Sequence, residues 1–216
     1  MPTPLQPDSA PRVTRHRARR AGVIRTAIFA SLLTAMLAGA GSPAQAQDDR
    51  KQTRAAKSRV PVPVEKIQVD DGDTVNILWG PGDTEIIRIL GIDTPETQHV
   101  EHNLPFDQPF GREARGFGLG AFAAAQQVEL LRAEMTDPYG RTLGYLFING
   151  VNYSVLVVRA GLAAESVSHY GDNRFPDEAA AVAAATKEAG ALPFENPWDY
   201  RKRMRIFSDA QKAGQR

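Results

Sequence analysis

The sequence predicts a mixed α+β fold, mainly β, built on a five-stranded barrel of the OB type with about three helices. Segments rich in β-branched residues occur three times before residue 93 and twice more between residues 128 and 147. Helical segments lie between these two groups and after the second group. Five strands with helices in those two places fit an OB-type barrel, which is one of several topologies that this order allows.

The first three strands are predicted to form a meander. Residues 60–69 are rich in valine, and two prolines among them indicate an edge strand or an irregular entry. The turn at residues 70–73 leads into residues 74–79, which alternate in polarity as a second strand. A second turn, at residues 80–83, precedes the third strand over residues 85–92.

The second half of the chain alternates between helices and strands. Residues 110–127 are alanine-rich and predict a helix, although the interior glycines Gly116, Gly118 and Gly120 weaken it by roughly 1 kcal/mol each. Residues 128–134 and 142–147 read as the fourth and fifth strands. Residues 153–160 predict a short helix, and residues 177–189 a longer one with acids at its start and glycine after its end.

Residues 1–46 have the layout of a secretory signal peptide. An arginine-rich start precedes the apolar stretch of residues 27–40, and an Ala-x-Ala cleavage site ends at Ala46. The apolar stretch is shorter than the roughly 18 residues that normally span a membrane, which disfavours an anchor. We expect export to the periplasm or the medium, and the pair Arg19-Arg20 leaves a twin-arginine signal open.

The remaining chain is predicted to be a flexible linker, residues 47–59, followed by one domain over residues 60–216. Without the leader, 170 residues carry 20 basic and 24 acidic side chains, a formal net charge of −4. Nucleic-acid binding therefore requires a local basic patch rather than a global field. The absence of cysteine excludes thiol catalysis, zinc–thiolate sites and a lipoprotein anchor.

The run Ile86 to Thr97 carries the strongest chemical signal. It places Arg88 inside an apolar strand, where a guanidinium needs an anionic partner. The strand ends in Asp93, Thr94 and Glu96, whose oxygens suit Ca²⁺ or Mg²⁺. A cation, a buried guanidinium and a spare carboxylate together indicate phosphate ester chemistry. A purely structural ion pair at Arg88 is the alternative.

Each of the other charged residues, taken alone, can be interpreted as structural instead of functional. Asp71 and Asp73 flank a glycine, as in many simple turns, and an EF-hand is excluded because Gly82 stands at its twelfth position. Arg141 follows a Tyr-Gly turn and could be solvated. The basic residues near the C-terminus form either a solvated face or a nucleic-acid contact; they are Arg201, Lys202, Arg203 and Arg205.

Taken together, five segments closely resemble the thermonuclease family, the staphylococcal nuclease-like proteins. They are DGDTV at residues 71–75, RILGIDTPET at 88–97, GREA at 111–114, DPYGR at 137–141 and VVRAGLA at 157–163. The resemblance covers roughly residues 60–200 and implies an OB-fold enzyme that binds one Ca²⁺ and hydrolyses DNA and RNA. By position, it implies that Asp73, Asp93 and the Thr94 carbonyl bind calcium, with Asp71 behind them.

The resemblance also implies the catalytic residues. Glu96 takes the place of the carboxylate that activates or positions water, and Arg88 and Arg141 are the two arginines on the scissile phosphate. Forked guanidiniums can bind phosphate oxygens in pairs, and they stabilise charge that develops as water attacks. No Ser–His or Cys–His pair stands out, so water is the expected nucleophile.

The substrate-binding positions depart from the family pattern. The loop at residues 98–110 is longer than in the family type and lacks its lysines, and Val167 and His169 fall where base-stacking tyrosines are expected. Tyr139 and Tyr170 are the predicted substrate contacts. We expect a monomer without membrane contact that favours single-stranded DNA or RNA, because an OB groove grips exposed backbone and bases. A noncatalytic OB module that binds nucleic acid or a protein partner is the alternative.

Overall fold

The computed structural model describes residues 50–214; residues 1–49 and 215–216 lie outside the described part. The predicted signal peptide, residues 1–46, therefore falls outside it. Within residues 50–214 we find no helix with the length and apolar character that crossing a membrane requires.

The described chain is a mixed α+β fold around a curled sheet. Its strands are β1 (Arg59–Val62), β2 (Ile67–Val69), β3 (Thr74–Gly80), β4 (Asp83–Ile89), β5 (Ile92–Asp93), β6 (Val128–Thr136), β7 (Thr142–Ile148), β8 (Val151–Asn152) and β9 (Ala164–Glu165). The main sheet has the order β1-β6-β7-β4-β3-β2, with β8 beside β7, and β5 pairs separately with β9. The pairing of β4 with β7 is parallel, and the other neighbours are antiparallel.

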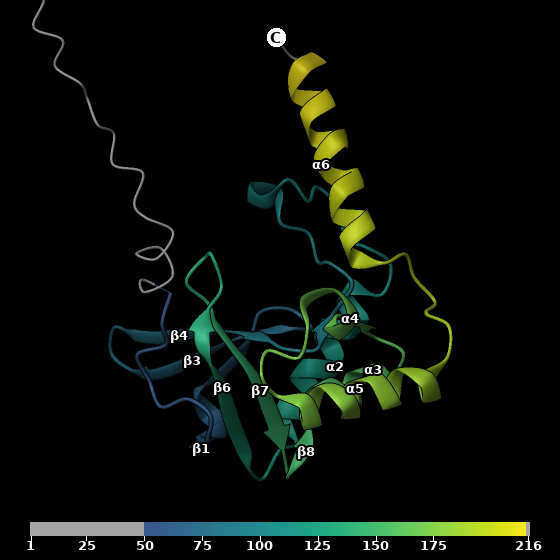
Figure 1. Cartoon of the computed structure of the whole chain (residues 1–216). Coiled ribbons are helices and arrows are strands. Elements are labelled where there is room, and N and C mark those ends of the chain that lie inside the picture. The colour runs from purple at the N-terminus through teal and green to yellow at the C-terminus, as the bar shows by residue number, and fades with distance from the viewer. Residues whose placement is uncertain (1–49, 215–216) are drawn as a thin grey trace, which may run out of the picture. The chain divides into compact units, whose positions relative to one another are not determined.

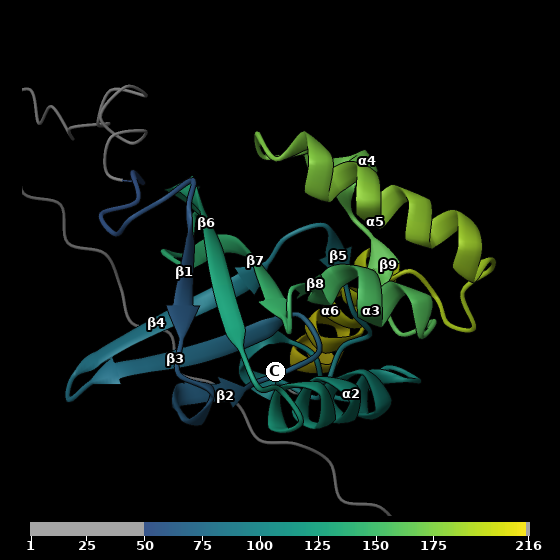
Figure 2. The same ribbon diagram turned by 90° about the horizontal axis from the view of Figure 1, so that it is seen from below.

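The connection between β1 and β2 forces the sheet to curl. These strands form opposite edges of the sheet, yet only the short 3₁₀ turn η1 (Val64–Lys66) and Pro63 separate them in the chain. A flat sheet would hold the edges about 24 Å apart at roughly 4.8 Å per strand. The extended chain from Val62 to Ile67 spans at most about 18 Å. The two edges therefore approach each other and make a half-barrel, which Figure 2 shows from below.

The predicted strands are present, with differences at the first and the third. Residues 60–69, predicted as an edge strand or an irregular entry, are divided between β1 and β2 by the 3₁₀ turn η1. That division follows the prolines at 61 and 63, which cannot donate to a ladder. The third predicted strand, residues 85–92, corresponds to β4 as far as Ile89, whereas Ile92 belongs to β5 in the separate pair with β9. The other predicted strands correspond to β3, β6 and β7.

The described residues contain more helices than the predicted three or so. They are α2 (Gly111–Ala123), α3 (Tyr153–Arg159), α4 (Val167–Tyr170), α5 (Pro176–Ala189) and α6 (Pro197–Gly214), with the 3₁₀ turn η2 (Val100–His102) in the loop before α2. The predicted helices correspond to α2, α3 and α5, whereas α4 and α6 were missed. Helix α6, yellow in Figure 1, extends beside the loop that carries η2.

Part of the predicted linker contacts the sheet. Lys51 bridges to Met135, and the Gln52 amide donates to the Glu134 carbonyl at 2.8 Å. Arg54 forms an ion pair with Asp83. Residues 50–58 thus lie against β6 and β4, and the flexibility predicted for residues 47–59 stays a prediction.

The core lies between the curled sheet and helices α3 and α5. Ile77, Ile87 and Leu130 from the sheet and Val157 and Val182 from the helices are fully buried. Burying each such side chain stabilises the fold by roughly 1.5–3 kcal/mol. This packing fixes the ends of β3 and β4, where the polar residues described next converge.

Candidate active site

Two carboxylates and one guanidinium meet where β3 begins and β4 leads into β5. Asp73 directly precedes β3, and strand register sets Arg88 opposite Thr74. The Arg88 guanidinium forms ion pairs with both Asp73 and Asp93, the second at 2.9 Å from Nη2 to Oδ1. Asp73 and Asp93 are 6% and 5% exposed. The structure therefore brings the predicted metal carboxylates together on the predicted phosphate arginine.

Backbone contacts hold Asp71 and Thr94 beside this pair. The Thr94 amide donates to Asp73 Oδ2 at 2.8 Å, and the Asp73 amide donates to Asp71 Oδ1 at 2.9 Å. A Cβ on Gly72 would lie 2.8 Å from the Thr94 side chain, so only glycine lets the turn approach this closely. The DGD turn and the end of β5 are thereby locked against each other.

Glu96 is held from both its backbone and its side chain. Its amide donates to the buried Gln108 Oε1 at 3.1 Å, and a Cβ on Gly111 would lie 2.2 Å from its carbonyl oxygen. Its carboxylate forms an ion pair with Arg201. The loop before α2 and the start of that helix therefore fix Glu96 beside the Asp73 and Asp93 carboxylates.

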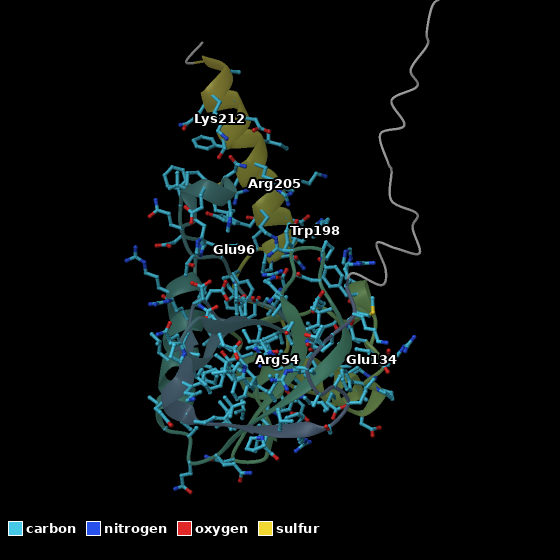
Figure 3. The ribbon with its side chains drawn as sticks, turned by 90° about the vertical axis from the view of Figure 1, so that its left-hand side faces the viewer. Arg54, Glu96, Glu134, Trp198, Arg205 and Lys212 are labelled. Atoms are coloured by element: carbon cyan, nitrogen blue, oxygen red, sulfur yellow. The ribbon has the colours of Figure 1, made fainter. Side chains whose placement is uncertain are left out.

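Arg201 joins the cluster from helix α6. Its Nη1 and Nη2 donate to Asp93 Oδ1 and Oδ2 at 3.0 and 2.7 Å, and Nη1 also contacts Glu96. In Figure 3, Glu96 lies near the end of α6 closest to the sheet, the same end that carries Trp198. Sequence reasoning placed Arg201 only in a basic cluster. The one sequence signal that could have located Arg201 is the pair Asn196-Pro197, which is typical of a helix start and lies about one turn before it.

The balance of charge shifts several pKa values. Burial, together with the Asp73 carboxylate, raises the pKa of Asp71 to about 8. Burial also opposes ionisation of Asp73, but Arg88 and the Thr94 amide outweigh it and hold the pKa of Asp73 below its usual value. Burial raises the pKa of Glu96; Arg201 opposes this rise, and the Asp73 carboxylate adds to it.

This acidic cluster fits a divalent cation by its charge and its atoms. When all groups are ionised, four carboxylates face two guanidiniums; they are Asp71, Asp73, Asp93 and Glu96 against Arg88 and Arg201. Burial, and after it the Asp73 carboxylate, accounts for the raised pKa of Asp71 in this cluster. Within residues 50–214, no three His, Asp or Glu side chains are arranged as a metal-binding group. The predicted set instead combines two carboxylates with the Thr94 carbonyl, which are hard oxygen donors.

A pocket of about 530 Å³ adjoins the acidic cluster at Arg88. Its lining includes Arg88, Arg141, Tyr139 and Tyr170, the predicted phosphate and substrate residues. None of Asp73, Asp93, Thr94 and Glu96 lines it. Arg88 is therefore the one predicted site residue that belongs to both the cluster and the pocket.

The turn between β6 and β7 presents Arg141 and Tyr139 to the pocket. Asp137 Oδ1 accepts from the amides of both residues at 2.8 and 2.9 Å, and Asp137 Oδ2 accepts from Arg141 Nε at 2.6 Å. Among contacts within residues 50–214, the terminal nitrogens of Arg141 make no hydrogen bond. A planar guanidinium held through Nε keeps its terminal nitrogens available for an anion.

The predicted tyrosines are exposed at this pocket. Tyr139 is 85% exposed and lies near the Arg141 guanidinium, with 5.7 Å between ring centroid and Cζ. Tyr170, at the end of α4, is half-exposed and packs edge-on against His169, which in turn contacts the Trp198 ring. The aromatic surface beside the pocket thus comes from Tyr170, His169 and Trp198, of which sequence reasoning identified only Tyr170 as a contact.

This geometry places two guanidiniums, Arg88 and Arg141, on one pocket beside a cluster of carboxylates, and paired guanidiniums can bind phosphate oxygens. Comparison with known proteins gives the family. Residues 86–191 match the family model described as staphylococcal nuclease homologue. Residues 86–191 are therefore a staphylococcal nuclease family domain within this chain. Asp71 and Asp73 precede the matched range.

Similar proteins include two thermonucleases. The chain is 39% identical over 97 residues to the thermonuclease of Staphylococcus intermedius, covering 44% of this chain and 55% of that protein. It is 38% identical over 98 residues to the thermonuclease of Staphylococcus hyicus, covering 45% and 55%. It is also 27% identical over 109 residues to endonuclease YncB of Bacillus subtilis (strain 168), covering 50% of each. The chain spans about half the length of these relatives.

Proposed function

We propose that this protein is an exported, Ca²⁺-dependent nuclease that hydrolyses phosphodiester bonds of DNA, RNA or both by attack of water. The observation that carries the proposal is the position of Arg88, which joins the acidic cluster to the pocket lined by Arg141 and Tyr139. The printed names of the relatives, thermonuclease and endonuclease, support it. The curled sheet is consistent with the OB-type barrel that we propose as the complete fold.

Asp73, Asp93 and the Thr94 carbonyl would hold the calcium ion, and Asp71 would stand behind them. Bound there, Ca²⁺ would supply positive charge that stabilises the negative charge developing on the phosphate. The same charge would lower the raised pKa of Asp71.

The protein's own residues divide the remaining work. Arg88 and Arg141 bind the phosphate oxygens from the pocket side and hold the phosphorus for attack. Glu96 accepts the proton of the attacking water or positions that water; burial raises its pKa toward the range in which a carboxylate takes up a proton more readily. One P–O bond forms to the water oxygen as one ester P–O bond breaks, and the released alkoxide oxygen takes up a proton from solvent. Tyr139 and Tyr170 provide rings on which bases can stack, which favours single-stranded substrates.

Catalysis is tested by incubating the purified protein with a labelled single-stranded DNA or RNA in Ca²⁺, and in parallel with excess chelator. We expect cleavage with Ca²⁺ and none with chelator, because two of the three proposed calcium ligands are carboxylates that need a cation. The alternative, a noncatalytic OB module, predicts that the substrate is bound but stays intact in both conditions. The same preparation run on a sizing column tests the proposed monomer.

Export is a separate proposal, supported by the basic start, apolar stretch and Ala-x-Ala site of residues 1–46. Expression of the full chain in a Gram-negative host, followed by N-terminal sequencing of the periplasmic and medium fractions, tests it. We expect the exported protein to begin at Gln47. Recovery of the uncleaved chain in the cytoplasm alone would contradict export.

A further inference from the structure

Helix α6 packs against the loop at residues 98–110 through contacts remote from Asp93 and Glu96. Leu104 of the loop forms a small buried cluster with Tyr200 and Met204 of the helix. The Tyr200 hydroxyl donates to the Phe106 carbonyl at 2.9 Å, and Ser208 Oγ donates to the Asn103 carbonyl at 3.2 Å. These contacts fix α6 against the loop at residues 98–110.

The start of α6 is also tied to the backbone of Glu96. Gln108, which is 1% exposed, accepts from the Glu96 amide and donates through Nε2 to the Glu195 carbonyl, just before α6. Asn196 then begins the helix, because its side chain accepts from the Trp198 amide at 2.9 Å. One buried amide therefore couples the position of Glu96 to the position of α6.

At this anchored end, Arg201 bridges Asp93 and Glu96. Three donor contacts run from its two terminal nitrogens to the two carboxylates. Glu96 carries the same charge as Asp73 and Asp93, which lie close enough to repel it. Arg88, bound to Asp73 and Asp93, makes no contact with Glu96 among the described residues. Arg201 is thus the cation that keeps the Glu96 carboxylate beside the cluster.

Helix α6 reaches the cluster without closing the pocket. None of its residues, Pro197–Gly214, lines the pocket that Arg88, Arg141, Tyr139 and Tyr170 share. A helix that blocked substrate would occupy that lining.

From this geometry, and resting on the proposed nuclease function, we propose that Arg201 is a positioning residue. Delivered by α6, its guanidinium holds the Glu96 carboxylate in the place from which Glu96 acts on the attacking water. The arginine itself does not touch substrate. Outer partners of this kind typically change activity by about 10–100-fold when removed.

The test compares Arg201→Gln, Arg201→Lys and the control Arg203→Gln at saturating Ca²⁺ and saturating single-stranded DNA. Arg203 lies two residues along the same helix and pairs with Glu195 on the surface, outside the cluster. We expect Arg201→Gln to lower kcat by about 10–100-fold with KM within about twofold of wild type. Arg201→Lys should restore part of the loss, because it keeps the charge without the fork. Arg203→Gln should match wild type.

Two outcomes overturn the proposal with an active wild-type protein. One is a kcat for Arg201→Gln equal to that of Arg203→Gln. The other is a kcat for Arg201→Gln that is unchanged at saturating Ca²⁺ while the variant needs less Ca²⁺ than wild type. That result would mean that Arg201 competes with the cation for the carboxylates.

A second readout is independent of catalysis. Denaturant unfolding is measured for Arg201→Gln, Glu96→Gln and the double variant. The change in the unfolding equilibrium constant of the double variant should differ about tenfold from the product of the two single changes. If the two single effects on unfolding free energy were additive, the ion pair between Arg201 and Glu96 would be excluded. An inactive wild-type protein would overturn the proposed function and the positioning role with it, whereas the coupling would still report whether the ion pair forms.

Discussion

Replacing Arg88 with lysine is expected to lower kcat by on the order of 10² or more. The Arg88 guanidinium contacts Asp73 and Asp93 at once and also lines the pocket proposed for the phosphate. A lysine ammonium is a compact point charge and cannot make these divergent contacts together. The measurement is kcat on single-stranded DNA at saturating Ca²⁺, with thermal unfolding to verify that the variant is folded. The kcat of Arg141→Lys is expected to fall by the same order, because lysine lacks the forked guanidinium that the β6–β7 turn holds at the pocket.

The matched control for Arg88→Lys is Arg159→Lys. Arg159 pairs with Glu188 at 2.8 Å on the surface, away from the cluster and the pocket. It should keep the wild-type kcat. A folded Arg88→Lys protein that cleaves as fast as this control would show that Arg88 has only a structural role.

The largest expected effect on stability comes from Glu85 of β4, which lies outside the acidic cluster. Glu85 is buried and accepts two hydrogen bonds from the buried Arg132, each at 2.8 Å. It also accepts from Trp79 Nε1 at 2.7 Å and Thr142 Oγ1 at 2.8 Å. Removing one partner of a buried ion pair costs about 3–5 kcal/mol, because the other charge stays buried without compensation. Glu85→Gln should lower the free energy of unfolding by about that amount.

The same residue predicts a pH dependence. Burial opposes ionisation of Glu85, but the hydrogen bonds from Arg132, Trp79 and Thr142 outweigh it and lower its pKa in the folded state. Its stabilising contribution is therefore complete above the unfolded value of 4.5 and is lost as the pH falls through the folded pKa. The difference in unfolding free energy between wild type and Glu85→Gln should narrow below about pH 4.5.

Denaturant unfolding at pH 7 and at pH 4 or below measures both effects. Glu129→Gln is the control, because Glu129 forms only a half-exposed pair with Arg59 at 3.8 Å, for which less than about 1 kcal/mol is expected. If Glu85→Gln were no less stable than Glu129→Gln at pH 7, the buried network would not contribute as proposed.

Much of the sheet and of the candidate site was predictable because its signals are local in sequence. The alternation of β3 and β4 and the acids at the strand ends are read within a few residues of each other. The structure brings Asp73, Asp93 and Arg88 together as the segments at residues 71–75 and 88–97 imply. Close packing at Gly72 then holds the two segments against each other.

Helix α6 and Arg201 were missed because their signals are not local. Arg201 meets Asp93 from 108 residues away in the sequence, and Ser208 meets Asn103 from 105 residues away. The helix buries few apolar side chains, chiefly Tyr200 and Met204, so it has no continuous apolar stripe that periodicity could detect. Its position depends on hydrogen bonds to loop carbonyls, which side-chain patterns do not encode.

The Glu85–Arg132 pair was missed for a related reason. Glu85 lies on the buried face of β4 with Ile87 and Ile89, and its partners Arg132 and Thr142 come from β6 and β7. Sequence alternation assigns side chains to two faces, but it does not give the partners that distant strands supply to a buried charge.

The rate of single-stranded DNA cleavage as a function of free Ca²⁺ concentration, measured for wild type and Asp93→Asn, tests the central claim most directly. The proposed site predicts a wild-type rate that rises from the chelated baseline to a plateau. It predicts that Asp93→Asn needs a much higher Ca²⁺ concentration or stays at the baseline, because one of two carboxylate ligands is lost. A wild-type rate that is the same in excess chelator as in saturating Ca²⁺ would contradict the account.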